Sequence, residues 1–169
     1  MDAMEAMLTR RSIRKYTDRP VSEETVKNLL TVAMAAPTAA DQRTWEFVVI
    51  EDRKMLDEIP RFHPFSNMLK QAPLAVCVCS DLHKETKIGY WPQECGAATQ
   101  NILIAANAMG LGAVWLGIHP VEERVKGLKK LLSLPDRVMP LSLIALGYPA
   151  EEKPPLNRYD EEKVHRNGW

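Results

Sequence analysis

The most hydrophobic run of the chain, Glu94–Met109, limits the possible folds more than any other segment. Four polar residues interrupt the run: Thr99, Gln100, Asn101 and Asn107. The run is also shorter than the roughly 20 residues that span a bilayer. We therefore predict a helix buried in the core rather than a membrane segment. Gly110 follows the run and suits the left-handed residue that ends many helices.

The rest of the chain predicts a mixture of short helices and strands. Helical spacing and capping residues predict helices at residues 2–9, from Ser22 to before Pro37, from Asp52 onwards and at 121–132, with one helical turn at 66–71. Apolar runs predict strands at residues 46–50, 74–79, 112–117 and 141–146. We expect Met34 and Met55 to face the core. Because the helices and strands do not strictly alternate, we predict the α+β class, with residues 1–169 in a single domain.

Two polar segments carry large hydrophobic side chains. The segment Asp81–Gln93 contains scattered aromatic residues, and we predict that it forms a mobile cover. The tail after residue 149 is rich in proline, which keeps a chain extended, and it ends at Trp169. We expect Trp169 to pack on something, such as a second subunit.

The charge balance argues against partners that need a strong overall field. Lys plus Arg and Asp plus Glu each total 22, so we expect neither nucleic acid nor membrane as a partner, and any anion site must be local. Cys77 and Cys79 would share one face of a strand with poor disulfide geometry, and Cys95 stands alone on a helix. With no secretory signal visible, we expect a reducing, cytoplasmic setting.

Residues 10–16 form a dense basic stretch near the amino terminus. They hold three arginines, one lysine and one serine, and each guanidinium offers paired donors that suit a phosphate. Alternation along an extended chain would direct Ser12 and Arg14 to one side and bury Ile13 on the other. Taken alone, the stretch is more typical of a solvated basic turn.

Five segments together resemble the nitroreductase family of FMN enzymes. They are residues 10–16, the loop 37–45, residues 66–70 before the second strand, the helix and strand over 97–117, and the ending Leu146–Ala150 with Arg158. These segments occur in order and cover essentially the full chain. The resemblance implies an α+β homodimer in which helices flank a nitroreductase-like central mixed or antiparallel sheet. It also implies that FMN lies at the subunit interface.

The resemblance assigns thirteen residues to the cofactor. It implies that phosphate and ribityl contacts come from Arg10, Arg11, Ser12 and Arg14, with Arg14 reaching towards the flavin ring, and that Arg158 closes on the phosphate. It implies ring contacts from Asn67, Lys70, Leu116 and Gly117, and from the partner subunit's loop with Pro37, Thr38, Ala39 and Asp41. Asn67 can donate and accept at the pyrimidine edge of the ring, and Lys70 would favour the anionic reduced flavin.

The loop departs from the family pattern at two positions. Asp41 stands where the family usually has Asn, and Thr44 stands where Pro is common. An ionised Asp41 cannot donate a hydrogen bond, so we expect it to pair with Arg43 or Arg11 instead.

The implied activity is that of an FMN-dependent NAD(P)H oxidoreductase. Reduced nicotinamide would pass hydride through flavin N5 to a small electrophilic acceptor, such as a nitroaromatic or a quinone, in a ping-pong cycle. No catalytic side chain and no metal is then expected. His63, Tyr90 and Trp91 are candidates for the substrate face, whereas we interpret Glu94 as an ordinary charge at a helix N-terminus.

Two alternatives stay open. One is another flavin reaction on the same scaffold, either reductive dehalogenation or flavin fragmentation. The other is a non-enzymatic module that binds a phosphorylated ligand. The sequence contains neither a GxGxxG nor a GxxxxGK[ST] motif, so a nicotinamide would dock only transiently.

Overall fold

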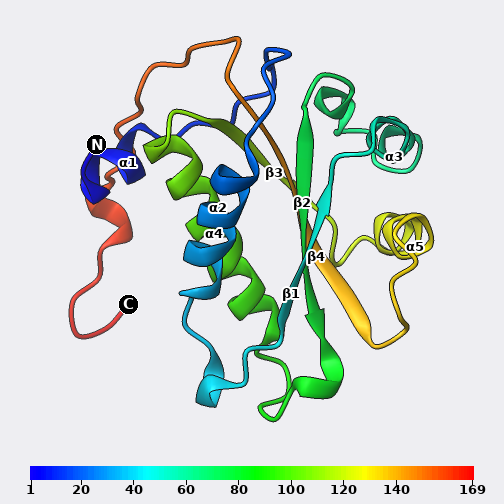
Figure 1. Ribbon diagram of the computed structural model, residues 1–169. Helices are drawn as coiled ribbons and strands as arrows, with labels where there is room; N and C mark the ends of the chain where they lie inside the picture. The colour runs from blue at the N-terminus through cyan, green and yellow to red at the C-terminus, as the bar shows by residue number, and fades with distance from the viewer.

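A four-stranded antiparallel sheet forms the centre of the computed structural model, which describes residues 1–169 (Figure 1). The strands are β1 (Trp45–Ile50), β2 (Leu74–Asp81), β3 (Gly112–Gly117) and β4 (Val138–Gly147), in the order β1-β2-β4-β3. All three ladders are antiparallel. The predicted α+β class is therefore confirmed, and β1 and β3 are the two edge strands.

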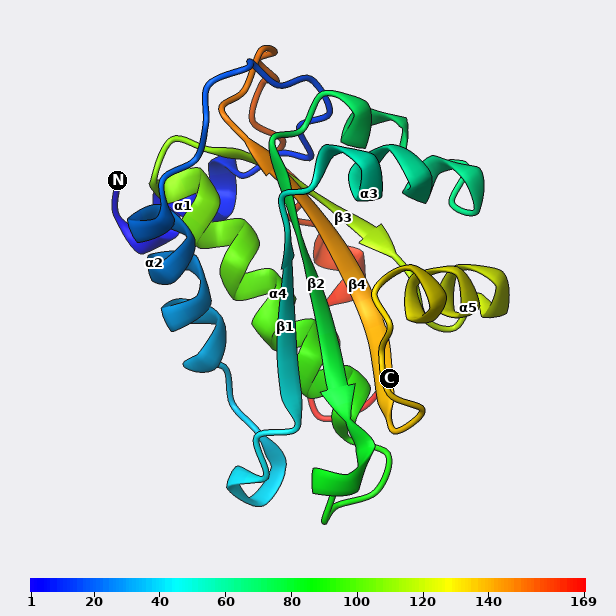
Figure 2. The ribbon, with the colours of Figure 1, turned by 45° about the vertical axis from the view of Figure 1, so that its right-hand side comes forward.

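Helices cover both faces of the sheet (Figure 2). On one face lie α2 (Glu23–Met34) and α4 (Trp91–Ala108), and on the other α3 (Arg53–Glu58) and α5 (Glu122–Leu131), while α1 (Ala3–Thr9) packs against α4. Successive side chains of a strand point to opposite faces. In β2, Val76 and Val78 accordingly enter the core under α4, whereas Cys77 and Cys79 enter the other core. This double cover explains why every residue of β2 is buried.

Three predicted helix starts are confirmed by their caps. The side chains of Asp2, Ser22 and Asp52 each accept a hydrogen bond from a backbone N–H in the first turn of α1, α2 and α3. Gly110 takes a positive φ of 75° just beyond α4, as predicted. Turns of 3-10 helix complete the chain: η1 (Ala39–Asp41), η2 (Ile59–Arg61), η3 (Asn67–Lys70), η4 (Leu82–Lys84) and η5 (Glu161–Lys163).

Several details of the prediction were wrong. Met34 and Met55 are exposed, because each lies at the border of its helix's apolar stripe. The segment predicted as a cover gives its last three residues, from Trp91, to α4. Strand β4 begins at Val138 rather than at residue 141, and Pro140 is accommodated where the pairing with β2 shifts register.

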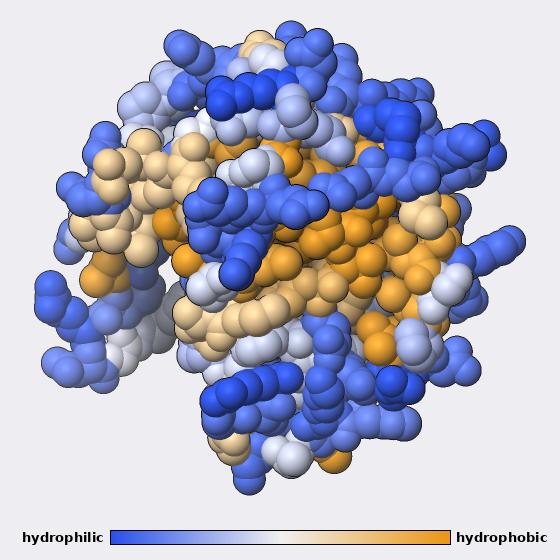
Figure 3. Space-filling model, in the orientation of Figure 1, coloured by the Kyte–Doolittle hydropathy of each residue, from blue (hydrophilic) through white to orange (hydrophobic).

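The tail beyond Gly147 runs extended over the surface before η5, as predicted. Trp169 is fully exposed and stacks only on His165, with ring centroids 4.4 Å apart, so it does not pack on the body of its own chain. Hydrophobic side chains also appear on the surface over α1, where Met4, Met7 and Leu8 are exposed (Figure 3). None of the helices combines the length and the apolar character that a membrane span requires.

Candidate functional site

The edge of β3 that faces away from β4 presents backbone groups that no strand of the sheet pairs. Ile118 N donates to Leu141 O at 3.1 Å, which places residue 118 in a hydrogen-bonded pair with β4. In an antiparallel ladder the backbone groups of alternate residues point to opposite sides, so those of residues 113, 115 and 117 point away from β4. The contact of Ile13 N with Ala113 O, 3.0 Å long, confirms this direction. The N–H of Gly117, rather than that of Leu116, therefore faces outward.

The basic stretch lies along this edge. Ser12 forms a parallel bridge with Ala113, and Ile13 is buried against Gly112, where an added Cβ would lie 2.6 Å from Ile13 Cγ2. Tyr16 anchors the end of the stretch, because its buried hydroxyl donates towards the carbonyl of Ile13 at 2.7 Å. Burial raises the pKa of Tyr16 above its ordinary value, so the hydroxyl stays protonated. As predicted, Ile13 enters the core while Arg14 stays exposed.

A cavity of about 460 Å³ opens beside the edge of β3. Four of the predicted cofactor residues line it together: Arg14, Asn67, Leu116 and Gly117. They come from the basic stretch, η3 and β3. Lys70 lies on η3 with Asn67, but it does not line this cavity.

The same cavity is lined by Arg124 and Phe65, which the sequence did not single out, and by His63, which was a candidate for the substrate face. Arg124 of α5 lies over the ring of Phe65, 5.6 Å from its centroid. His63 also lines the cavity with its side chain almost fully buried, and no aspartate or glutamate is among the lining residues. Burial and the nearby Arg124 lower the pKa of His63, so the imidazole favours its neutral form.

Three predicted phosphate residues meet in a second hollow of about 660 Å³. Arg10, Arg11 and Arg158 line it, between α1 and the tail. Burial lowers the pKa of Arg10, and the charges of Arg11 and Arg158 lower it further. None of the three forms an ion pair with a carboxylate of the chain. This hollow thus holds uncompensated positive charge, which a phosphate dianion would neutralise.

Arg11 has a second task. Its Nε and Nη2 donate to the carbonyl of Pro154 at 2.7 and 2.8 Å, so this guanidinium fastens the tail to the basic stretch. Two residues of the tail, neither of them predicted, also join the tail to the basic stretch. Lys153 Nζ donates to Ser12 O at 2.6 Å, and Glu151 accepts from Arg14 N at 2.6 Å. The tail therefore fixes the backbone from which Ser12 and Arg14 project.

The predicted loop contacts lie elsewhere in the protomer. Pro37, Thr38 and Asp41 line a hollow before β1, the edge strand opposite β3, and Ala39 begins η1 beside them. Asp41 pairs with Arg43 through bonds of 2.6 and 2.7 Å, so the expected alternative with Arg43 is confirmed.

The backbone of this loop is unusual. Ala40, Asp41 and Arg43 all have positive φ, with 54° at Asp41. Asn and Asp are the residues other than Gly that most readily adopt this conformation. Asp41 therefore keeps the loop shape that an Asn would allow, although it loses the amide donor.

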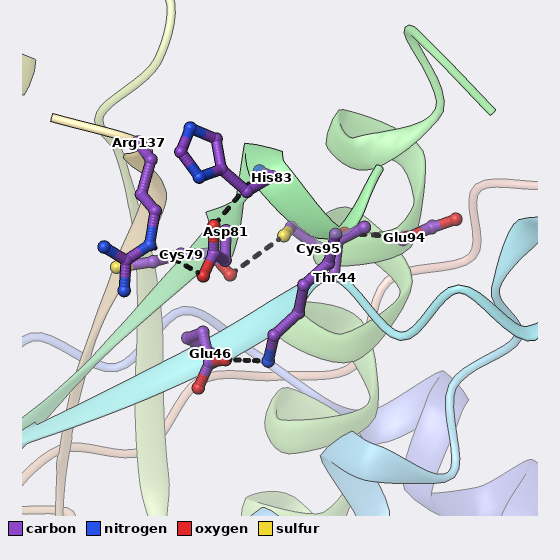
Figure 4. A network of polar contacts seen from close by, with 9 residues as sticks. Thr44, Glu46, Cys79, Asp81, His83, Glu94, Cys95 and Arg137 are labelled. Carbon is purple, nitrogen blue, oxygen red and sulfur yellow. Dashed lines mark hydrogen bonds and ion pairs between the residues drawn. The ribbon is translucent and has the colours of Figure 1, made fainter. Parts of the chain in front are cut away.

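The interpretation of Glu94 as an ordinary helix charge was wrong. Its carboxylate is buried and accepts from Ala39 N at 2.8 Å, Gln42 Nε2 at 2.6 Å and Thr44 Oγ1 at 2.9 Å. Figure 4 shows Glu94 on α4 pointing to Thr44 before β1. Thr44, fully buried, donates a bond that a proline could not, so the second departure from the family pattern has a structural role.

Gln42 extends this network to the segment predicted as a cover. Its Oε1 accepts from the N–H groups of Thr86 and Lys87 at 2.9 and 2.8 Å. Farther along the cover, the carboxylate of Glu85 accepts from three successive N–H groups beginning at Gly89. The candidate aromatics of this segment do not line the edge cavity.

Comparison with known proteins places this geometry in context. The chain matches the family described as "Nitroreductase family" over residues 7–64 and 61–148. It is 48% identical to a protein of Methanothermobacter thermautotrophicus provisionally named NADH dehydrogenase/NAD(P)H nitroreductase, over 100% of this chain and 88% of the relative.

Two solved structures show the same fold. One, from Parabacteroides distasonis, has the same provisional name, a TM-score of 0.95 and 44% identity, and the match covers 99% of this chain and 98% of that one. The other, an FMN-dependent nitroreductase from Clostridium difficile, has a TM-score of 0.92 and 30% identity over 98% of this chain and 99% of that one. The chain belongs to the nitroreductase family.

Proposed function

We propose that residues 1–169 form one FMN-binding domain of an NAD(P)H-dependent oxidoreductase that reduces small electrophilic acceptors, such as nitroaromatics or quinones. The observation that carries this proposal is the cluster of Arg10, Arg11 and Arg158, which has no carboxylate partner and adjoins the stretch that holds Arg14. The names of the relatives, NAD(P)H nitroreductase and FMN-dependent nitroreductase, support the same activity. Three free buried cysteines support a reducing, cytoplasmic setting.

The residues present fit FMN. When bound, FMN would supply N5 as the atom that accepts and gives hydride. Arg10 and Arg158, with Ser12, would hold the phosphate. Asn67 offers a donor and an acceptor to the pyrimidine edge, and Arg14 supplies positive charge in the ring cavity.

We propose that a homodimer completes the site. The loop residues Pro37, Thr38, Ala39 and Asp41 lie before the edge strand opposite β3, so within one protomer they and the edge cavity are separate. In a symmetric dimer this loop can reach the cavity of the second copy. The exposed side chains of α1 support such an interface. Lys70 would then meet the ring from η3.

Flavin binding by a charge-matched pair of variants tests the proposal. Arg10→Ala with Arg14→Ala removes two guanidiniums from the site, and at about 1.5 kcal/mol for each charge-assisted bond FMN should bind roughly 100-fold more weakly. The control, Arg61→Ala with Lys126→Ala, removes two positive charges from exposed ion pairs and should leave the affinity unchanged. Equal affinity of the two variants for FMN would refute the site.

The reaction itself is tested by rapid mixing. Reduced nicotinamide, as NADH or NADPH, should bleach the FMN absorbance of the purified holoprotein, and a nitroaromatic should restore it. Restoration by a halogenated phenol but not by the nitroaromatic would favour dehalogenation. A colourless protein that cannot be reconstituted with FMN would favour the non-enzymatic alternative.

A further inference from the structure

Two side chains converge on the carbonyl oxygen of Gly117. His63 Nε2 lies 3.1 Å from this oxygen, and Arg124 Nη1 donates to it at 2.8 Å. His63 follows η2, and Arg124 lies in α5, so two separate segments on the same face of the sheet meet at one backbone atom. Neither side chain forms an ion pair with a carboxylate.

Gly117 is the point of the edge strand that most needs such support. It is exposed, and an added Cβ would meet no atom within 4 Å, so neighbouring side chains do not restrain it. Glycine also has the widest choice of backbone angles. The next peptide is held on its other side by the bond from Ile118 N to Leu141 O. With its carbonyl bound by His63 and Arg124, the peptide after Gly117 is fixed at both ends.

Burying the His63 side chain lowers the stability of the fold. His63 is 1% exposed, and its Nδ1 has no hydrogen-bond partner. A buried polar atom without a partner is destabilising, whereas an apolar residue of similar size would avoid that cost. The imidazole forms its hydrogen bond with the Gly117 carbonyl, and Gly117 lines the cavity.

We propose that His63 and Arg124 are positioning residues that lock Gly117 so that its outward N–H points into the cavity, where the flavin ring would accept it. The inference rests on the proposed function. The two donors act on the backbone and not on the flavin: they fix the dihedral angles of Gly117 and so preorganise its N–H as a donor at the cavity.

The test uses paired variants that remove or keep each donor. His63→Leu and Arg124→Met remove them, whereas His63→Gln and Arg124→Lys keep an N–H within reach. Val125→Ala, a neighbour of Arg124 packed on the same core, lowers stability without touching Gly117 and serves as control. Three quantities are measured: the FMN affinity of the apoprotein, the midpoint potential of the bound flavin, and exchange of the Ile118 amide without FMN.

Each donor-removing variant should weaken FMN binding about tenfold, shift the midpoint potential, and speed exchange of the Ile118 amide at least tenfold. The tenfold change corresponds to about 1.4 kcal/mol, which is the contribution of one hydrogen bond. The donor-keeping variants should recover most of each change, and Val125→Ala should change none. If the wild type binds FMN and the donor-removing variants match Val125→Ala, the proposal is overturned while the proposed function stands. If the wild type does not bind FMN, the proposed function fails, and this inference fails with it.

Discussion

Replacing Glu94 by Gln tests whether a buried carboxylate holds the loop before β1. The substitution keeps the shape of the side chain and removes its charge. Three donors now point at the carboxylate, from Ala39 N, Gln42 Nε2 and Thr44 Oγ1, at 2.6 to 2.9 Å. A glutamine amide offers one oxygen to these donors and turns its NH₂ group towards at least one of them.

The expected cost follows from these contacts. A hydrogen bond to a charged group contributes about 1.5–3 kcal/mol, and a buried donor left unpaired costs about 1–3 kcal/mol. The contributions overlap, because the three donors share one carboxylate, so Glu94→Gln should lower the free energy of unfolding by about 2–4 kcal/mol. Glu24→Gln, in the first turn of α2 where the side chain is exposed, loses only a helix-dipole interaction of about 0.3–1 kcal/mol.

Urea unfolding of both variants at pH 7, followed by circular dichroism, measures this difference. The slope of free energy against urea should stay the same, so that the shift in midpoint reports stability alone. If Glu94→Gln loses no more stability than Glu24→Gln, then Glu94 is an ordinary helix charge after all, and the network drawn around it does not stabilise the loop.

Two further predictions concern the edge of β3. Gly112→Ala should cost about 1–3 kcal/mol of stability and weaken FMN binding, because the added methyl group would lie 2.6 Å from Ile13 Cγ2 and displace that side chain. The control is Gly96→Ala, whose added Cβ would meet its nearest atom at 3.8 Å and should change neither quantity. Urea unfolding measures the stability, and titration with FMN measures the binding. Burial and Arg124 lower the pKa of His63 below 6.5, so the unfolded chain binds more protons and stability should fall as the pH drops from 6.5 towards the lowered pKa. The variant His63→Gln should show a flatter pH dependence, and identical slopes would contradict the assignment.

Local patterns predicted much of the fold. Capping residues located the starts of three helices, and apolar runs located all four strands, because both signals lie within a few neighbouring residues. The family resemblance likewise assigned Arg14, Asn67 and Gly117 to one cofactor, and in the structure they line one cavity. These residues belong to motifs in which the spacing along the chain carries the information.

The parts that were missed depend on contacts between distant segments. Glu94 reads as a helix charge unless one knows that a loop 50 residues away turns its donors towards it. Lys153 meets Ser12 across 141 residues, and His63 meets Gly117 across 54, with no periodic signal for either. Strand β4 extended past its predicted start because the irregular register with β2 tolerates Pro140. Such features follow from tertiary geometry, which propensity alone does not encode.

The amide of Gln42 has a consequence for how the segment after η4 can move. One end of it is bound to the buried Glu94, and the other receives two N–H groups from the segment after η4. A displacement of that segment must therefore either break these bonds or pull η1 along with it. Two stretches that are 44 residues apart are therefore coupled through the side chain of one glutamine.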